Sequence, residues 1–148
     1  MLSQVEHLSV VVGGLGIGYT AAAALEDARV ERVLFIEKLL PVIRWHEDGL
    51  ISFGERLTGD PRAQFVEGDF FRMADSTDGL DPSHAGQQFH AILLDIDHTS
   101  DFHLSAWHAA FYQHNGLRRF ANNLCPRGIF ALWSNQLPDY DFLTRLRS

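Results

Sequence analysis

Cysteine and basic residues are scarce in this sequence. Its 148 residues include a single cysteine, Cys125, and 12 lysines and arginines against 19 aspartates and glutamates. One cysteine excludes an internal disulfide and fits a reducing compartment, so we expect a cytoplasmic protein. The formal net charge of −7 argues against the basic surface on which nucleic-acid binding depends. We therefore expect no nucleic-acid partner.

Long apolar runs are also missing. No stretch approaches the roughly 20 residues that a membrane helix needs, and the N-terminus lacks the basic flank and apolar segment of a secretory signal. We therefore expect neither a membrane partner nor export. Hydrophobic residues make up 46% and charged residues 21%, as in folded globular proteins. The length suits one domain, and residues 1–148 are interpreted as a single domain.

Apolar runs alternate with helical patterns along the chain, which is typical of βαβ units and a parallel sheet. We expect strands at 8–12, 32–36, 63–67, 90–94 and 128–133, and helices at 19–26, 41–48, 105–120 and 140–146. Residues 74–88 read as a connection, and the third helix has a potential break at Asn115-Gly116. The predicted fold class is α/β, a doubly wound Rossmann-like parallel sheet of order 3-2-1-4-5. Its ligand is expected between the first and fourth strands.

A glycine-rich segment connects the first strand to the first helix. Gly13, Gly14, Gly16 and Gly18 would allow a tight turn, close approach to a ligand and close helix packing. Glu37 lies 19 positions beyond Gly18 (37 − 18) and closes the second strand, where a carboxylate can accept both ribose hydroxyls. The alternative is a structural turn followed by an unrelated surface glutamate.

The glycine spacing indicates which nucleotide is bound. No Gly-Lys-Ser/Thr follows, so the loop is not of the Walker type, and GxGxG differs from the GxGxxG of dinucleotide sites. This spacing resembles S-adenosylmethionine enzymes. Gly68-Asp69 follows the third strand, where the carboxylate can accept from an adenine amino group, and Asp95 ends the fourth strand. Asp69 could instead serve only as a helix cap.

From about Leu8 to Trp133, the sequence resembles a known family, the spermidine synthases. The matching segments are 13–18, 30–33 with Glu37, 60–62, 68–69, 89–95, 111–112 and 126–128. The resemblance implies the class I methyltransferase-like Rossmann core, decarboxylated S-adenosylmethionine as cofactor, and transfer of its aminopropyl group to the polyamine putrescine. It also implies that Glu37 binds ribose, that Asp69 binds adenine, and that Asp95 lies near the reacting amine.

The sequence also departs from the family. Gly16 stands where the family usually has an aspartate, and Asp95-Ile96-Asp97-His98 replaces Asp-Ser/Thr-Ser/Thr-Asp. Neither the family's N-terminal β-domain nor the last strands of its seven-stranded sheet is expected, so the sheet would be truncated. These differences leave intact S-adenosylmethionine open as the cofactor and methyl transfer open as the reaction.

Two acidic residues are the candidates for catalysis. Asp95 and Asp97, two apart in an extended segment, can face one cleft and accept a proton from an amine that attacks a sulfonium carbon. Asp97 is equally well explained as a loop cap. Methyl transfer needs mainly positioning. The acceptor is expected to be a small molecule, with a cationic one favoured for aminopropyl transfer.

Several residues fit other roles. His98, His103 and His108 have no zinc-ligand spacing, so no metal is expected. Trp45 and His46 are interpreted as helix packing rather than cofactor stacking. A third possibility is a non-catalytic assembly domain, because an exposed fifth strand could pair with another chain in a homodimer. Phe130, Leu132 and Trp133 would support that interface, although a core position is the favoured interpretation.

Overall fold

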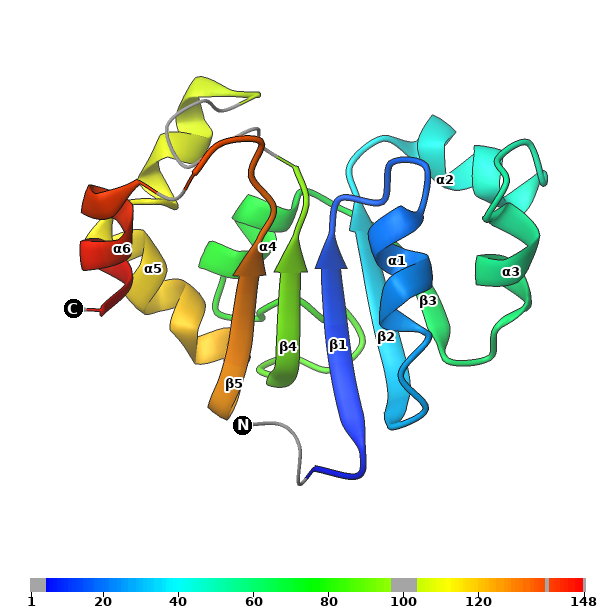
Figure 1. Cartoon of the computed structure of the whole chain (residues 1–148), viewed down its shortest axis with the longest axis horizontal. Helices are drawn as coiled ribbons and strands as arrows, with labels where there is room; N and C mark the ends of the chain where they lie inside the picture. Colours follow the sequence, from blue (N-terminus) through cyan, green and yellow to red (C-terminus); the bar gives the residue numbers. More distant parts are fainter. Residues whose placement is uncertain (1–4, 97–103, 138, 148) are drawn as a thin grey trace.

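A five-stranded parallel sheet lies at the centre of the molecule (Figure 1). The computed structural model describes residues 5–96, 104–137 and 139–147. The strands are β1 (Leu8–Gly13), β2 (Val30–Glu37), β3 (Ala63–Glu67), β4 (Phe89–Leu94) and β5 (Leu124–Leu132). Their order is β3-β2-β1-β4-β5 and each pair is parallel. The doubly wound α/β sheet predicted from the sequence is therefore confirmed.

Helices cover both faces of the sheet. The α-helices are α1 (Tyr19–Ala24), α2 (Leu40–Glu47), α3 (Gly54–Gly59), α4 (Phe70–Asp75), α5 (His114–Phe120) and α6 (Tyr140–Arg147), and two 3-10 helices are η2 (Ala106–Ala110) and η3 (Ala121–Asn123). One core cluster packs α1, α2 and α3 on one face, and another packs α4, α5 and α6 on the other. No helix in the described ranges is long and apolar enough to cross a membrane.

Strand β1 supplies side chains to both cores. Val10 and Val12 belong to the cluster under α1, whereas Val11 belongs to the cluster under α4 and α5, because successive side chains of a strand point to opposite faces. All three valines are 4% exposed or less. This continuous burial explains the uninterrupted apolar run of a central parallel strand, and it fixes the strand that leads into the glycine loop.

The prediction of one helix at 105–120 is wrong, because this segment forms two separate helices. The chain forms η2, leaves helical geometry at its end, and begins α5 at His114. The break therefore precedes Asn115-Gly116 rather than falling on it, and Gly116 lies inside α5. A Cβ at Gly116 would come within 2.3 Å of the Ala110 carbonyl oxygen, so glycine there serves close packing against η2. The sequence pattern does not predict the short helices α3 and α4.

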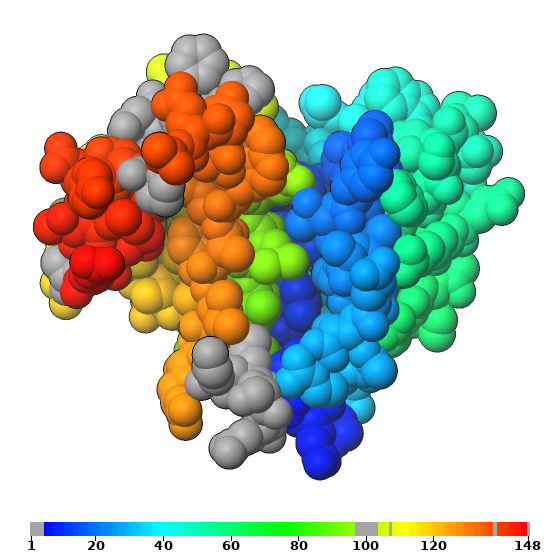
Figure 2. Space-filling view, viewed as in Figure 1, coloured from blue at the N-terminus to red at the C-terminus, as the bar shows by residue number. Residues whose placement is uncertain are grey.

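Strand β5 lies at an edge of the sheet and pairs with β4 alone among the described residues. Ile129 and Trp133 are 43% and 49% exposed, while Phe130 and Leu132 pack partly buried against the core. Figure 2 shows β4 at the surface between α1 and β5, so no helix of the described residues lies over this part of the face. The core interpretation therefore holds for Phe130 and Leu132 and is wrong for Trp133. Homodimer formation stays a prediction.

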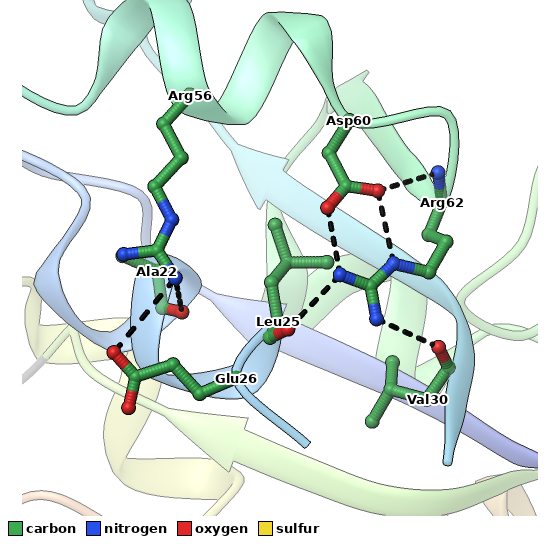
Figure 3. A network of polar contacts seen from close by, with 7 residues as sticks. All are labelled: Ala22, Leu25, Glu26, Val30, Arg56, Asp60 and Arg62. Atoms are coloured by element: carbon green, nitrogen blue, oxygen red, sulfur yellow. Dashed lines mark hydrogen bonds and ion pairs between the residues drawn. The ribbon is translucent and has the colours of Figure 1, made fainter. Parts of the chain in front are cut away.

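Arg62 ties three elements together at the start of β3 (Figure 3). Its guanidinium donates to both carboxylate oxygens of Asp60, to the Val30 carbonyl at 3.1 Å and to the Leu25 carbonyl at 2.9 Å. The hydrogen bond from Arg62 lowers the pKa of the Asp60 carboxyl below its ordinary value. Arg56 makes longer polar contacts: its guanidinium lies 3.4 Å from the Ala22 carbonyl oxygen and 3.7 Å from the Glu26 carboxylate.

We expect Arg62→Ala to lower the free energy of unfolding by about 1–2 kcal/mol, because two carbonyls and a partly buried carboxylate lose their donor. Arg56→Ala, with its longer contacts, should change it by less than about 0.5 kcal/mol. Denaturant unfolding at neutral pH measures both. Because the folded pKa of Asp60 is depressed, its stabilising contribution is complete above about pH 4 and disappears as the pH falls through the folded value. Equal losses for the two variants would contradict the assignment.

Candidate functional site

The glycine loop turns at the carboxyl end of β1. Gly14, Gly16 and Gly18 all have positive φ, at 91°, 49° and 95°. The Gly14 N–H donates to the Ile36 carbonyl at 2.9 Å, and the Asp95 N–H donates to the Gly13 carbonyl at 2.8 Å. The loop is thus joined by main-chain hydrogen bonds to the ends of both β2 and β4. A Cβ on Gly14 would lie 2.4 Å from the Asp95 carbonyl oxygen, whereas one on Gly16 would meet nothing within 4 Å.

Glu37 ends β2 and holds the loop from the side. One carboxylate oxygen, Oε2, accepts from the Leu15 N–H at 3.0 Å, and Oε1 accepts from the Leu39 N–H at 2.9 Å. Each carboxylate oxygen has a further lone pair, so the two hydroxyls of a ribose still find acceptors there. The structure places Glu37 where the sequence predicts it, and adds a structural role that the spacing did not reveal.

Asp69 begins α4 as its N-cap. Its Oδ1 accepts from the N–H groups of Phe71 and Arg72 at 3.1 and 3.3 Å, so the capping alternative is realised. Its Oδ2 lies 2.9 Å from Lys38 Nζ, and the side chain is 11% exposed. A Cβ on Gly68, just before it, would lie 2.5 Å from Met73 Sδ, so a side chain there would require the Met73 side chain to move. The capping hydrogen bonds orient the carboxylate, and Oδ2, beside Lys38, is the oxygen that they do not use.

Asp95 follows β4 and is oriented by α1. Thr20 Oγ1 donates to Asp95 Oδ2 at 2.6 Å, a contact between residues 75 positions apart. This hydrogen bond uses one of the acceptor positions of the carboxylate and leaves Oδ1 for a ligand in the cleft. Asp97, predicted as a second catalytic carboxylate, lies outside the described residues, as do His98 and His103.

These residues line one cleft of about 450 Å³ at the carboxyl edge of the sheet. Of the predicted site residues, its wall includes Gly14, Gly16, Glu37, Gly68, Asp69 and Asp95. Gly13 and Gly18 are not part of the wall: Gly13 packs on Phe70 and Leu94, and Gly18 packs on His46 and Leu57. The volume is that of an ordinary small-ligand pocket. Two smaller cavities, about 230 and 310 Å³, contain none of the glycine-loop residues.

The cleft wall also includes residues outside the predicted site. Lys38, Leu39 and Val42 line it after β2. His108 lies opposite, 6% exposed, with its ring stacked on Phe71 at a centroid distance of 3.9 Å. In the sequence this histidine stands out only as one of three whose spacing fits no zinc-ligand motif. Its stacking partner comes from α4, so no local pattern could have paired the two.

His46 lies beneath the glycine loop and is fully buried. Its Nε2 is 2.9 Å from the Gly16 carbonyl oxygen, and its Cε1 faces Gly18. This agrees with the packing interpretation of His46, since it supports the loop rather than stacking on a ligand. Trp45 is 48% exposed and is not in the cleft wall.

The cleft is acidic. Glu37, Asp69 and Asp95 contribute three carboxylates, and Lys38 is the one lysine or arginine in its described wall. Such a surface favours a positively charged ligand. No group of three or more histidines, cysteines, aspartates or glutamates in the described part of the chain could hold a metal ion.

Comparisons with known proteins identify the fold. No protein-family model matches the chain, and no curated protein matches it by sequence. Among solved structures it is similar to spermidine synthase from Thermotoga maritima, with a TM-score of 0.68 and 18% identity over 96% of this chain and 45% of that one. It is also similar to a spermidine synthase in complex with the transition-state analogue AdoDATO. The TM-score is 0.66 and the identity 17%, over 96% of this chain and 44% of that one.

Human methyltransferase-like protein 13, in complex with SAH, is also similar, with a TM-score of 0.56 and 19% identity over 84% of this chain and 53% of that one. This chain spans less than half the length of the spermidine synthases it matches. These similarities show a class I methyltransferase-like fold, as the resemblance implied. At such low identity the shared property is the fold.

Two glycines of the loop provide a matched test of its geometry. Gly14→Ala should lower the free energy of unfolding by more than about 2 kcal/mol, because the Cβ adds a steric clash to a left-handed backbone. At Gly16 the added methyl group meets open space, so Gly16→Ala should lower the free energy of unfolding only by the cost of a left-handed backbone, about 1 kcal/mol. Thermal unfolding of both variants measures the difference. Equal destabilisation would show that the close approach to Asp95 does not constrain the loop.

Proposed function

We propose that this chain binds an adenosyl sulfonium cofactor and transfers an alkyl group from it to a small acceptor. The observation that carries the proposal is the convergence of Glu37, Asp69 and Asp95, from the ends of three strands, on one cleft beside the glycine loop. In parallel α/β sheets ligands bind at this edge, where the strand order reverses. Spermidine synthases and S-adenosylmethionine-dependent methyltransferases share the fold.

The residues present suit such a cofactor. Glu37 offers acceptors to the ribose hydroxyls, and Gly16, beside which the space is open, lets a ligand approach the loop backbone closely. Asp69 Oδ2 receives no hydrogen bond and lies 2.9 Å from Lys38 Nζ, so it is the acceptor that an adenine amino group could use once the lysine moves aside. When bound, a sulfonium cofactor supplies an electrophilic carbon attached to positively charged sulfur.

Asp95 is the residue we assign to the reacting end of the cleft. Thr20 holds Oδ2, which directs the carboxylate and leaves Oδ1 to bind the acceptor's ammonium or to accept its proton as the new bond forms. Thr20 is then a positioning residue for Asp95. Asp97 is proposed as a second carboxylate for the same task, on the basis of its sequence position.

The charge of the cleft favours decarboxylated S-adenosylmethionine over the intact cofactor. Three carboxylates against one lysine would repel the carboxylate of intact S-adenosylmethionine. This supports aminopropyl transfer. One observation favours methyl transfer instead: Gly16 provides no carboxylate at the position where spermidine synthases have one, although the space beside it is open.

Calorimetric titration with S-adenosylmethionine, its decarboxylated form and methylthioadenosine separates these reactions. We expect all three to bind and the decarboxylated form to bind most tightly, because it has an additional net positive charge and no carboxylate. Tighter binding of intact S-adenosylmethionine would identify a methyltransferase. If none of the three binds, both transferase functions are excluded and a non-catalytic assembly role remains.

Glu37→Ala should weaken the binding of all three ligands at least tenfold, since it removes the ribose acceptor and releases the Leu15 and Leu39 N–H groups. Glu31→Ala is the matched control. Glu31 lies at the other end of the same strand, 63% exposed and outside the cleft, so affinity should not change. Unchanged affinity for Glu37→Ala would show that the ribose assignment is wrong.

A further inference from the structure

The base end of the cleft holds a carboxylate oxygen that no ligand can reach directly. Asp69 Oδ1 is occupied by the N-terminal N–H groups of α4. Oδ2 is therefore the atom available to a ligand, yet it has less than 1 Å² of exposed surface. Lys38 Nζ lies 2.9 Å from it. The side chain that covers the acceptor is thus a lysine from the end of the neighbouring strand.

The contact between these two groups is an ion pair without hydrogen-bond geometry. The distance is short, but Oδ2 has no donor at an acceptable angle and is a buried acceptor without a hydrogen-bond partner. A buried acceptor in this state is less stable than one that receives a well-directed N–H. The Lys38 side chain is 61% exposed whereas Asp69 is 11% exposed, so the ammonium can move into water and recover its hydration when it leaves Asp69.

We propose that Lys38 is a displaceable cover over Asp69 and that it sets how strongly the site distinguishes a 6-amino purine from a 6-oxo purine. The inference rests on the proposed binding of an adenosyl ligand and identifies the residue that controls its base selectivity. With Lys38 in place, the base end presents an ammonium, which is a donor. With Lys38 displaced, it presents the Asp69 carboxylate, which is an acceptor.

The two states suit opposite bases. The amino group of adenine is a donor and can bind Oδ2 only after Lys38 has moved. The carbonyl of hypoxanthine is an acceptor and suits the ammonium of Lys38 where it stands. Lys38 therefore competes with adenine for Oδ2 and weakens adenine binding, whereas it strengthens binding of the 6-oxo base. With Lys38 present, the affinities for the 6-amino and 6-oxo bases are closer to each other than without it.

The probes are methylthioadenosine and methylthioinosine, two neutral nucleosides that differ in the 6-amino or 6-oxo group and in the adjacent N1, which accepts a hydrogen bond in adenine and donates one in hypoxanthine. We expect Lys38→Met to bind methylthioadenosine about two- to fivefold more tightly than the unmodified protein, which is the size of an exposed ion pair. The ratio of the two dissociation constants should shift toward adenine about three- to tenfold. A new apolar contact from the introduced thioether side chain would tighten both ligands equally and leave this ratio unchanged.

Lys38→Arg is the matched control, because it retains a cation beside Asp69 and should keep a ratio close to that of the unmodified protein. Raising NaCl from about 0.05 to about 0.5 M should tighten methylthioadenosine binding in the unmodified protein and leave Lys38→Met unchanged, because salt screens the ion pair. If methylthioadenosine binds but Lys38→Met does not change the ratio of the two dissociation constants, this inference is overturned and the proposed function still stands. If neither protein binds either nucleoside, both fail.

Discussion

The close approach of Gly14 to the main chain of Asp95 is the constraint on which the site depends. It lies where β1 and β4 separate, and a Cβ at Gly14 would be 2.4 Å from the Asp95 carbonyl oxygen. Main-chain hydrogen bonds from Gly14 to Ile36 and from Asp95 to Gly13 join the ends of β2, β1 and β4. Any side chain at this position would force the strands apart and separate the carboxylates beside them.

Each cleft carboxylate already has a structural task. Glu37 holds two loop N–H groups, Asp69 caps α4, and Asp95 accepts from Thr20. A carboxylate has about four acceptor positions, so these contacts orient the groups and leave others free for a ligand. Donors fixed by the fold thus hold the acceptors before a ligand arrives, which reduces the ordering that binding requires.

The two faces of the sheet differ in how completely they are covered. α4, α5 and α6 bury a continuous aromatic cluster on one face, including Phe70, Phe111 and Tyr112. On the other face the helices lie over β1, β2 and β3, and β4 is visible beside β5 (Figure 2). An open edge strand with exposed Ile129 and Trp133 is a surface that proteins commonly protect by pairing or covering. The cleft lies at the carboxyl ends of the strands.

The sequence by itself determined the strand order, the glycine loop and the positions of Glu37, Asp69 and Asp95, because buried parallel strands and strand-end turns leave local patterns of apolar residues and glycine. It did not reveal α3 and α4, because neither has the run of alanines that marks α1, which is also six residues long. Only the tertiary structure decided that Lys38 pairs with Asp69, that Thr20 donates to Asp95 and that His108 stacks on Phe71. These contacts join residues 31 to 75 positions apart (69 − 38 and 95 − 20), and their partners are set by how the strands and helices pack rather than by neighbours in the chain.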